Sequence, residues 1–224
     1  MNAKELIARR VALEIKSGTL VNLGIGLPTW VANFIPEGVS VTLDSENGLV
    51  GMGGKPPSGL ENWNLTDAGA SPVTALPGAA AFDSSVSFGL IRGGHLDVTV
   101  LGGLQVDSEG HLANWMVPGK MVPGMGGAMD LLNGARRVII AMQHTAQGAP
   151  KIVKKCTFPL TSIRVVDLIV TELAVIQPSA AGLVLLEYAP GVSVADIRQA
   201  TEAPLIVSEN VREMKLVQNE VPVV

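Results

Sequence analysis

Apolar residues recur along this chain at two different spacings, and glycine or proline separates most runs from the next. Ile7, Val11 and Ile15 stand four residues apart, which predicts a helix over Ala3–Ser17. Other runs are almost continuously apolar, as in strands that are buried on both faces. Two such strands are expected, at Arg137–Met142 and Val166–Thr171.

Shorter apolar segments predict the other elements. Strands are expected at Thr19–Leu23, Val39–Leu43, Leu96–Leu101, Leu112–Met116, Leu183–Glu187 and Pro204–Ser208. Helices are expected at Thr29–Phe34, Phe82–Ile91 and Ser193–Ala200. This alternation predicts an α/β fold with a mostly parallel sheet flanked by helices, in a single domain over residues 1–224. A long loop is expected over Gly53–Pro72.

Polar residues follow the predicted strand Val39–Leu43 directly, and a glycine-rich stretch comes after them. In a parallel α/β sheet ligands bind just past the carboxyl ends of strands, so Glu46 is the candidate nucleophile or base. Asn22 lies near the end of the preceding strand and would face the same cleft if the two strands are parallel neighbours. A plainer interpretation is open, because Asn47-Gly48 is a strong hairpin signal and Glu46 would then be a solvated residue beside the turn.

Two glycine-rich loops are further candidates. Gly24-Ile25-Gly26 follows a strand but lacks the third glycine of a dinucleotide-binding motif. Gly124–Leu132 predicts a glycine loop that opens a short helix, whose first amides suit a phosphate or a developing oxyanion. It is not a Walker P-loop, because Met121 follows Gly119-Lys120 where Ser or Thr is required. A sharp backbone turn is the plainer explanation of Gly24 and Gly26, and close packing explains the glycines of Gly124–Leu132 equally well.

The composition narrows the class of protein. The chain is 47% hydrophobic and only 16% charged, which indicates a large core, a buried partner surface, or both. With a net charge of −4 it has no broad basic field for nucleic acid. Cys156 is the single cysteine, and the three histidines stand far apart, so neither a disulfide nor a zinc site is expected. The absence of a signal-peptide core and of a membrane-length apolar stretch favours a cytoplasmic location away from the membrane.

The stretch Ser45-Glu46-Asn47-Gly48-Leu49-Val50-Gly51 resembles the glutamate motif of the family I CoA-transferases, in the β (B-type) subunit of the 3-oxoacid and acetoacetate enzymes. The similarity extends from about Ala3 to about Glu202. It includes four further blocks of sequence: Asn22–Pro28, Arg92–Asp97, Leu112–Trp115 and Val122–Asp130.

This resemblance implies the CoA-transferase (NagB/RpiA-like) fold and a role for each motif. Glu46 is implied as the catalytic nucleophile, which carries CoA as a glutamyl thioester in a ping-pong reaction between an acyl-CoA and a short-chain acid such as acetoacetate. The amides of Gly126, Gly127 and Ala128 are implied as the oxyanion or CoA site. The implied substrate contacts are Asn22, Gly24, Gly26 and Asn47.

The resemblance further implies that no metal or cofactor is needed, since the CoA thioester is itself a substrate. It implies a separate A (α) subunit, in an α2β2 assembly, because relatives with both halves on one chain carry an A-type half first. Three alternatives stay open: an acyl-CoA hydrolase on the same scaffold, a CoA-transferase for another acid pair (butyrate/acetate or 3-oxoadipate/succinate), and a non-enzymatic scaffold protein.

Overall fold

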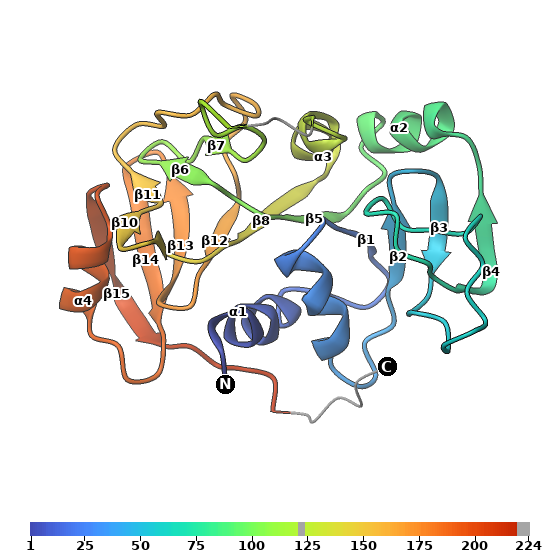
Figure 1. The fold of residues 1–224 in the computed structure, drawn as a ribbon. Coiled ribbons are helices and arrows are strands. Elements are labelled where there is room, and N and C mark those ends of the chain that lie inside the picture. Colours follow the sequence, from blue (N-terminus) through green and yellow to red (C-terminus); the bar gives the residue numbers. More distant parts are fainter. Residues whose placement is uncertain (121–123, 219–224) are drawn as a thin grey trace.

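A ten-stranded mixed sheet forms the centre of the computed structural model, which describes residues 1–120 and 124–218 (Figure 1). Its strand order is β15-β14-β13-β12-β8-β5-β1-β2-β3-β4. The five central strands, β12 to β2 in that order, are parallel, whereas β3, β4 and β13 pair antiparallel with their neighbours. In chain order the strands are β1 (Leu20–Leu23), β2 (Thr42–Ser45), β3 (Leu49–Met52), β4 (Ala75–Ala81), β5 (Val98–Leu101), β8 (Arg137–Ala141), β12 (Leu168–Val170), β13 (Ala174–Ser179), β14 (Gly182–Tyr188) and β15 (Leu205–Glu213).

Helices cover both faces of this sheet, as Figure 1 shows. One face carries α1 (Ala3–Ala12) and the 3₁₀ helix η1 (Leu27–Phe34); the other carries α2 (Ser84–Arg92) and α3 (Ala128–Gly134). Along β8, Val138 and Ile140 belong to the core on the α2–α3 face, and Ile139 belongs to the core on the α1 face. This alternation explains why the strand is apolar at almost every position.

Smaller elements complete the molecule. A three-stranded sheet joins β6 (Gln105–Asp107) to β7 (Leu112–Ala113) and β11 (Ile152–Val153), and β9 (Thr145–Ala146) pairs with β10 (Ala149–Pro150). Ser193 is the N-cap of helix α4 (Val194–Ala200), and its side chain forms a capping box with Asp196. Among the described residues, no helix is long and apolar enough to cross a membrane.

The first helix is shorter than its apolar spacing predicts, since it ends at Ala12 instead of Ser17. The chain then tightens into i→i+3 turns, with Glu14 N–H donating to Val11 O at 2.9 Å and Ile15 N–H to Ala12 O at 3.3 Å. Ile15 stays buried, so the apolar pattern continues past the true end of the helix.

Other sequence-based bounds need smaller corrections. The strand predicted over Val39–Leu43 runs over Thr42–Ser45, so Asp44 and Ser45 belong to the strand and Glu46 is the first residue after it. The strand predicted over Leu112–Met116 covers only Leu112–Ala113. Strand β15 extends beyond the predicted Pro204–Ser208, to Glu213. The loop expected over Gly53–Pro72 is confirmed, as this stretch forms no helix or strand.

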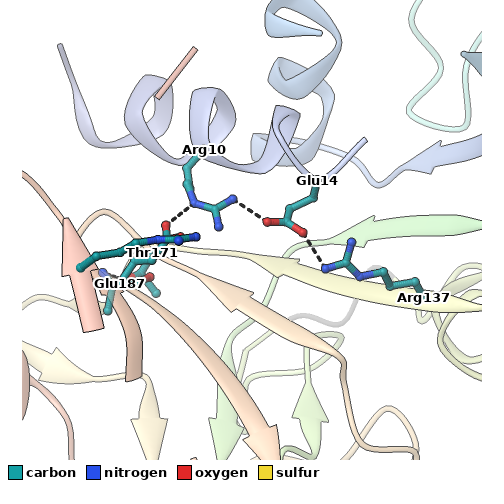
Figure 2. Close-up of polar contacts among 7 residues, drawn as sticks. Arg10, Glu14, Arg137, Thr171 and Glu187 are labelled. Carbon is teal, nitrogen blue, oxygen red and sulfur yellow. Dashed lines mark hydrogen bonds and ion pairs between the residues drawn. The ribbon is translucent and has the colours of Figure 1, made fainter. Parts of the chain in front are cut away.

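A network of ion pairs, centred on the buried side chains of Arg10 and Glu187, ties α1 to the sheet (Figure 2). Arg10 donates to Glu187 Oε2 from Nε at 2.6 Å and to Glu14 Oε1 from Nη1 at 2.7 Å. Glu14 also accepts from Arg137 Nη2 at 2.6 Å, and Glu187 accepts from Arg212. Three arginines and two glutamates thus join the N-terminal helix to β8, β14 and β15.

Candidate active site

Glu46 lies where the parallel strands β1 and β2 end side by side. The register pairs Asn22 with Asp44, so the expected parallel arrangement of these two strands is confirmed. Asn22 Nδ2 donates to Glu46 Oε2 at 2.9 Å and to the backbone oxygen of Asp44 at 3.3 Å. The sheet therefore brings the two predicted polar residues into direct contact.

A second hydrogen bond fixes the orientation of the Asn22 amide. Thr99 Oγ1, on the neighbouring strand β5, donates to Asn22 Oδ1 at 3.2 Å. Both side chains are fully buried. Since a hydroxyl proton points at Oδ1, the amide nitrogen faces the Glu46 carboxylate and offers it a fixed donor.

The hairpin expected at Asn47-Gly48 also exists, and it supports the site. Residues 46–48 connect β2 to the antiparallel strand β3. Gly48 has φ +120°, and a Cβ there would lie 2.0 Å from the backbone oxygen of Phe82, so only glycine fits this turn. The turn does not leave Glu46 as a solvated surface residue, because its side chain is partly buried and bonded to Asn22.

Two further motif residues hold the long loop against the hairpin. Ser45 Oγ accepts from the amide of Ala68 at 3.0 Å, and Asn47 Nδ2 donates to the carbonyl of Thr66 at 2.8 Å. Ser45 and Asn47 therefore have a structural role, because they fasten the loop to the hairpin. A substrate contact by Asn47 stays a prediction.

The first glycine loop serves packing at one position and leaves open space at the other. Gly24 N–H donates to Val100 O at 2.8 Å, and a Cβ at Gly24 would lie 3.0 Å from that oxygen, so close approach to β5 favours glycine here. Gly26 has φ +89° and nothing within 4 Å of a built Cβ. Approach of a ligand is therefore possible at Gly26, and its predicted role is still a prediction.

The second glycine loop lies beside the Glu46 side chain. A Cβ built on Gly127 would lie 3.3 Å from Glu46 Cγ and 3.0 Å from the ring of Phe88. Ala128 follows as the first residue of α3, and Gly126 precedes with φ +56°. The loop predicted to face the glutamate thus does so. Met121, Val122 and Pro123, which belong to the same stretch of sequence, lie outside the described residues.

One residue of the site, Asp44, has no role that the sequence motifs predict. It is only 4% exposed, and burial together with the charge of Glu46 raises its pKa to about 6, against the opposing effect of a hydrogen bond from Asn22. The sequence does indicate that Asp44 lies near Glu46, because the two residues are two positions apart and residues at this spacing in a strand share a face.

Other reactive side chains lie outside this site. Burial and the charge of Asp107 raise the pKa of Cys156 to about 12, so this thiol is not a nucleophile. His144 is buried between Thr171 and Thr201, at 2.9 and 2.8 Å. No group of three metal-binding side chains gathers anywhere in residues 1–120 and 124–218.

The sequence that carries this site matches a known family. A family model described as Coenzyme A transferase matches residues 4–200. The chain belongs to the coenzyme A transferase family. It is 56% identical over 219 residues to the beta subunit of the acetate CoA-transferase of Haemophilus influenzae, a match that covers 97% of this chain and 98% of that protein. It is 49% identical over 210 residues to the B-type subunit of a probable succinyl-CoA:3-ketoacid coenzyme A transferase of Bacillus subtilis, covering 93% and 97%.

The fold agrees with this membership. An acyl-CoA transferase of Escherichia coli O157:H7, solved as a thioester complex with CoA, superposes with a TM-score of 0.76 at 25% identity. The superposition covers 96% of this CoA-transferase chain and 43% of the E. coli chain. The resemblance to the β (B-type) subunit of the family I CoA-transferases, and the α/β fold that it implies, are therefore confirmed.

Proposed function

We propose that this CoA-transferase moves CoA between an acyl-CoA and a short-chain acid through a covalent glutamyl-CoA thioester on Glu46. The observation that carries the proposal is the position of Glu46, held at 2.9 Å by Asn22 and close beside the loop at Gly127. A carboxylate nucleophile suits this exchange, because CoA moves between two carboxyl groups of similar energy.

The first step transfers the acyl group to the enzyme. Glu46 attacks the acyl-CoA carbonyl, and the tetrahedral oxyanion is stabilised by the amides of Gly127 and Ala128, with Gly126 shaping the loop. CoA leaves as a thiolate, and an acyl-glutamyl anhydride forms.

The second step moves CoA onto the enzyme. The thiolate attacks the Glu46 carbonyl, which forms the glutamyl-CoA thioester and releases the first acid with one oxygen of Glu46. A second acid reverses these steps. The reaction as written needs no metal or redox cofactor, since the carboxylate performs the covalent chemistry itself.

Acetoacetate and acetate are the acceptors we favour. The resemblance in sequence points to 3-oxoacids, and the relatives described above carry acetate and 3-ketoacid names. We further propose that the chain acts with a separate A (α) subunit, in an α2β2 assembly, since both of those relatives are named as one subunit of a transferase. The cytoplasm is the compartment we propose, since a single free cysteine is compatible with a reducing environment.

Mass spectrometry of the trapped intermediate tests this proposal. The chain, purified with its α subunit, is mixed with acetoacetyl-CoA or succinyl-CoA without acceptor, quenched in acid and digested. We expect CoA on the peptide that contains Glu46, and we expect the adduct to disappear when acetate or acetoacetate is added.

Variants and side products make the experiment decisive. Glu46→Gln keeps the size of the side chain and removes the nucleophile, so turnover should fall by about 10⁴-fold or more while the two subunits still co-purify. Glu37→Gln is the matched control, because it removes the same charge from an exposed position. Accumulation of free CoA without any adduct would instead identify a hydrolase.

A further inference from the structure

Asp44 is a buried carboxyl group beside the proposed nucleophile. In parallel strands, directly paired residues point to the same face, and the registers pair Asn22 with both Asp44 and Thr99. These three polar side chains therefore form a row across β2, β1 and β5, on the sheet face that α2 and α3 cover. Asn22 connects the row to Glu46, since its amide bonds both the Asp44 backbone and the Glu46 carboxylate.

One oxygen of Asp44 lacks a hydrogen-bond partner. Among buried side-chain atoms of the described residues, only Asp44 Oδ2 and Ser87 Oγ are without one. A buried carboxylate without full hydrogen bonding is costly, and binding a proton removes most of that cost. Asp44 is thus built to hold a proton more firmly than an exposed aspartate would.

Glu46 is the charged group that acts on Asp44. The strand neighbours of Asp44 are Asn22 and Val50, and the buried positions of α2 are Ser87 and Ile91, all uncharged. In the loop over the hairpin, Asp67 is occupied by the amides of Gly69 and Ser71. The proton on Asp44 therefore responds mainly to the charge of Glu46.

That charge changes during the reaction proposed above. Glu46 is an anion in the free enzyme and becomes neutral in the anhydride and in the glutamyl-CoA thioester. Two adjacent anions repel each other in a site of low dielectric constant, so loss of the first charge makes the second carboxyl group more acidic.

We propose that Asp44 is a positioning residue whose proton is coupled to the state of Glu46: in mildly acidic solution it holds a proton while Glu46 is a free carboxylate and releases it when Glu46 becomes the thioester. The inference rests on the proposed function. The atoms balance as follows: the acyl-CoA C–S bond breaks, a C–S bond forms on Glu46, the acid leaves as a carboxylate, and the Asp44 proton passes to solvent. In the acidic range where Asp44 holds this proton, the pair then keeps one negative charge throughout.

The coupling sets a pH dependence with a definite sign. The pKa of Asp44 is about 6 with Glu46 ionised, because of burial and that neighbouring charge, and it is lower once Glu46 is neutral. The thioester state then binds fewer protons than the free enzyme. Its equilibrium constant of formation should rise with pH up to about pH 6, by at most about tenfold per unit, and level off above.

Proton release during thioester formation is the measurement that tests this. The enzyme with its α subunit is mixed with acetoacetyl-CoA, without acceptor, in weak buffer containing a pH indicator. Glu46→Gln supplies the background from binding alone, including titration of the CoA phosphates. After that subtraction we expect about half a proton per thioester at pH 6 and almost none at pH 8.

Two variants assign the proton to Asp44. Asp44→Asn is nearly isosteric and cannot titrate, so release at pH 6 should fall to the background, whereas Glu37→Gln should retain it. The wild-type comparison at the two pH values decides the matter even if Asp44→Asn does not assemble.

The outcomes separate this inference from the proposed function. Thioester on Glu46 with no proton released at pH 6, or with equal release in Asp44→Asn, would overturn the role of Asp44 and leave the transferase mechanism intact. No thioester at either pH would overturn both.

Discussion

At the scale of single residues, the site depends on side chains that are held before substrate arrives. Asn22 is the clearest example, because Thr99 fixes its amide and the amide in turn fixes Glu46. The nucleophile, its donor and the orienting hydroxyl come from three neighbouring strands: Glu46 follows β2, Asn22 lies in β1 and Thr99 lies in β5. Such preorganisation lowers the reorganisation needed in the transition state.

Removing this amide should slow chemistry more than it weakens binding. Asn22→Ala deletes a hydrogen bond to a charged group, a contact that contributes about 1.5–3 kcal/mol. We expect thioester formation to slow by about 10- to 100-fold, with a smaller change in KM for the acyl-CoA. Rapid-quench measurement of the glutamyl-CoA adduct checks this, with a substitution at an exposed position, Asn33→Ala, as control. An unchanged rate of thioester formation in Asn22→Ala would show that Asn22 does not assist the reaction.

At the scale of elements, much of the molecule was predictable from periodicity and turn residues. The central buried strands, the Ser193 cap of α4 and the position of Glu46 beyond β2 all follow from local signals. Strands β3 and β4 do not, because Gly51, Pro77 and Gly78 obscure any period-two pattern. Strand β13 also contains a proline, Pro178, and its apolar and polar residues do not alternate. Long-range pairing with neighbours, which no local window contains, makes these segments strands.

Candidate roles were predictable only as far as local chemistry allows. The spacing singled out Glu46 and Asn22, and the parallel register joined them. Distances across the fold, such as Gly127 to Glu46, depend on how α2 and α3 pack over the sheet. The spacing of Asp44 from Glu46 indicates a shared face, but the burial that raises the pKa of Asp44 depends on the same packing and is not visible in the sequence.

The loop before α3 gives a prediction at this scale. Gly127→Ala adds a methyl group 3.3 Å from Glu46 Cγ and 3.0 Å from Phe88, so the neighbours must shift by a few tenths of an ångström. A 1 Å misplacement of a catalytic group costs about 100-fold, and this smaller shift should lower kcat by about tenfold.

A glycine in the adjacent helix provides the control. A Cβ on Gly89 in α2 meets nothing within 4 Å, so Gly89→Ala should stabilise the protein by about 0.5–1 kcal/mol and leave turnover unchanged. Steady-state kinetics and thermal unfolding of both variants decide the matter. Equal kcat values for Gly127→Ala and the wild type would show that the loop does not constrain Glu46.

At the scale of the whole molecule, buried polar groups distant from Glu46 hold the layers together. His144 links Thr171, at the end of β12, to Thr201, after α4. Thr201 donates its proton to Ile197 O, so its oxygen accepts from His144 Nε2–H. The Thr171 hydroxyl lies 2.9 Å from Nδ1 and 3.3 Å from Ala174 O. Burial disfavours the charged ring, so His144 is neutral in the folded protein at neutral pH.

This histidine should make the protein less stable in mild acid. Burial lowers the pKa of His144 from 6.5 to about 4, so the unfolded chain binds a proton that the folded chain does not. Stability is complete above pH 6.5 and should fall by up to about 3 kcal/mol as the pH drops to 4. Urea unfolding of His144→Gln between pH 7 and 5 should show a weaker pH dependence than wild type or the exposed His95→Gln. Equal slopes would contradict the assignment.

The ion-pair network under α1 makes a separate contribution. Glu187→Gln weakens the pairing of buried Arg10, which keeps Glu14 as its other partner. Breaking a buried pair costs about 3–5 kcal/mol, and the remaining partner places this variant near the lower value. Thermal unfolding measures the loss, and Glu213→Gln on the exposed part of β15 should be neutral. A neutral Glu187→Gln would show that Glu14 alone suffices for Arg10.

The edge strand β4 has a consequence for the behaviour of the chain in solution. An exposed edge invites pairing with another chain, and many proteins prevent this with lysines. Strand β4 carries no charge at all; instead Pro77 withholds an N–H, Gly78 turns the backbone to φ +87°, and the register slips between Val50 and Met52. A chain with so few charged residues thus limits self-association by interrupting the regular backbone geometry of its own edge strand. Replacing Pro77 and Gly78 with valine would make β4 a more regular strand, and we expect it to lower the solubility of the protein.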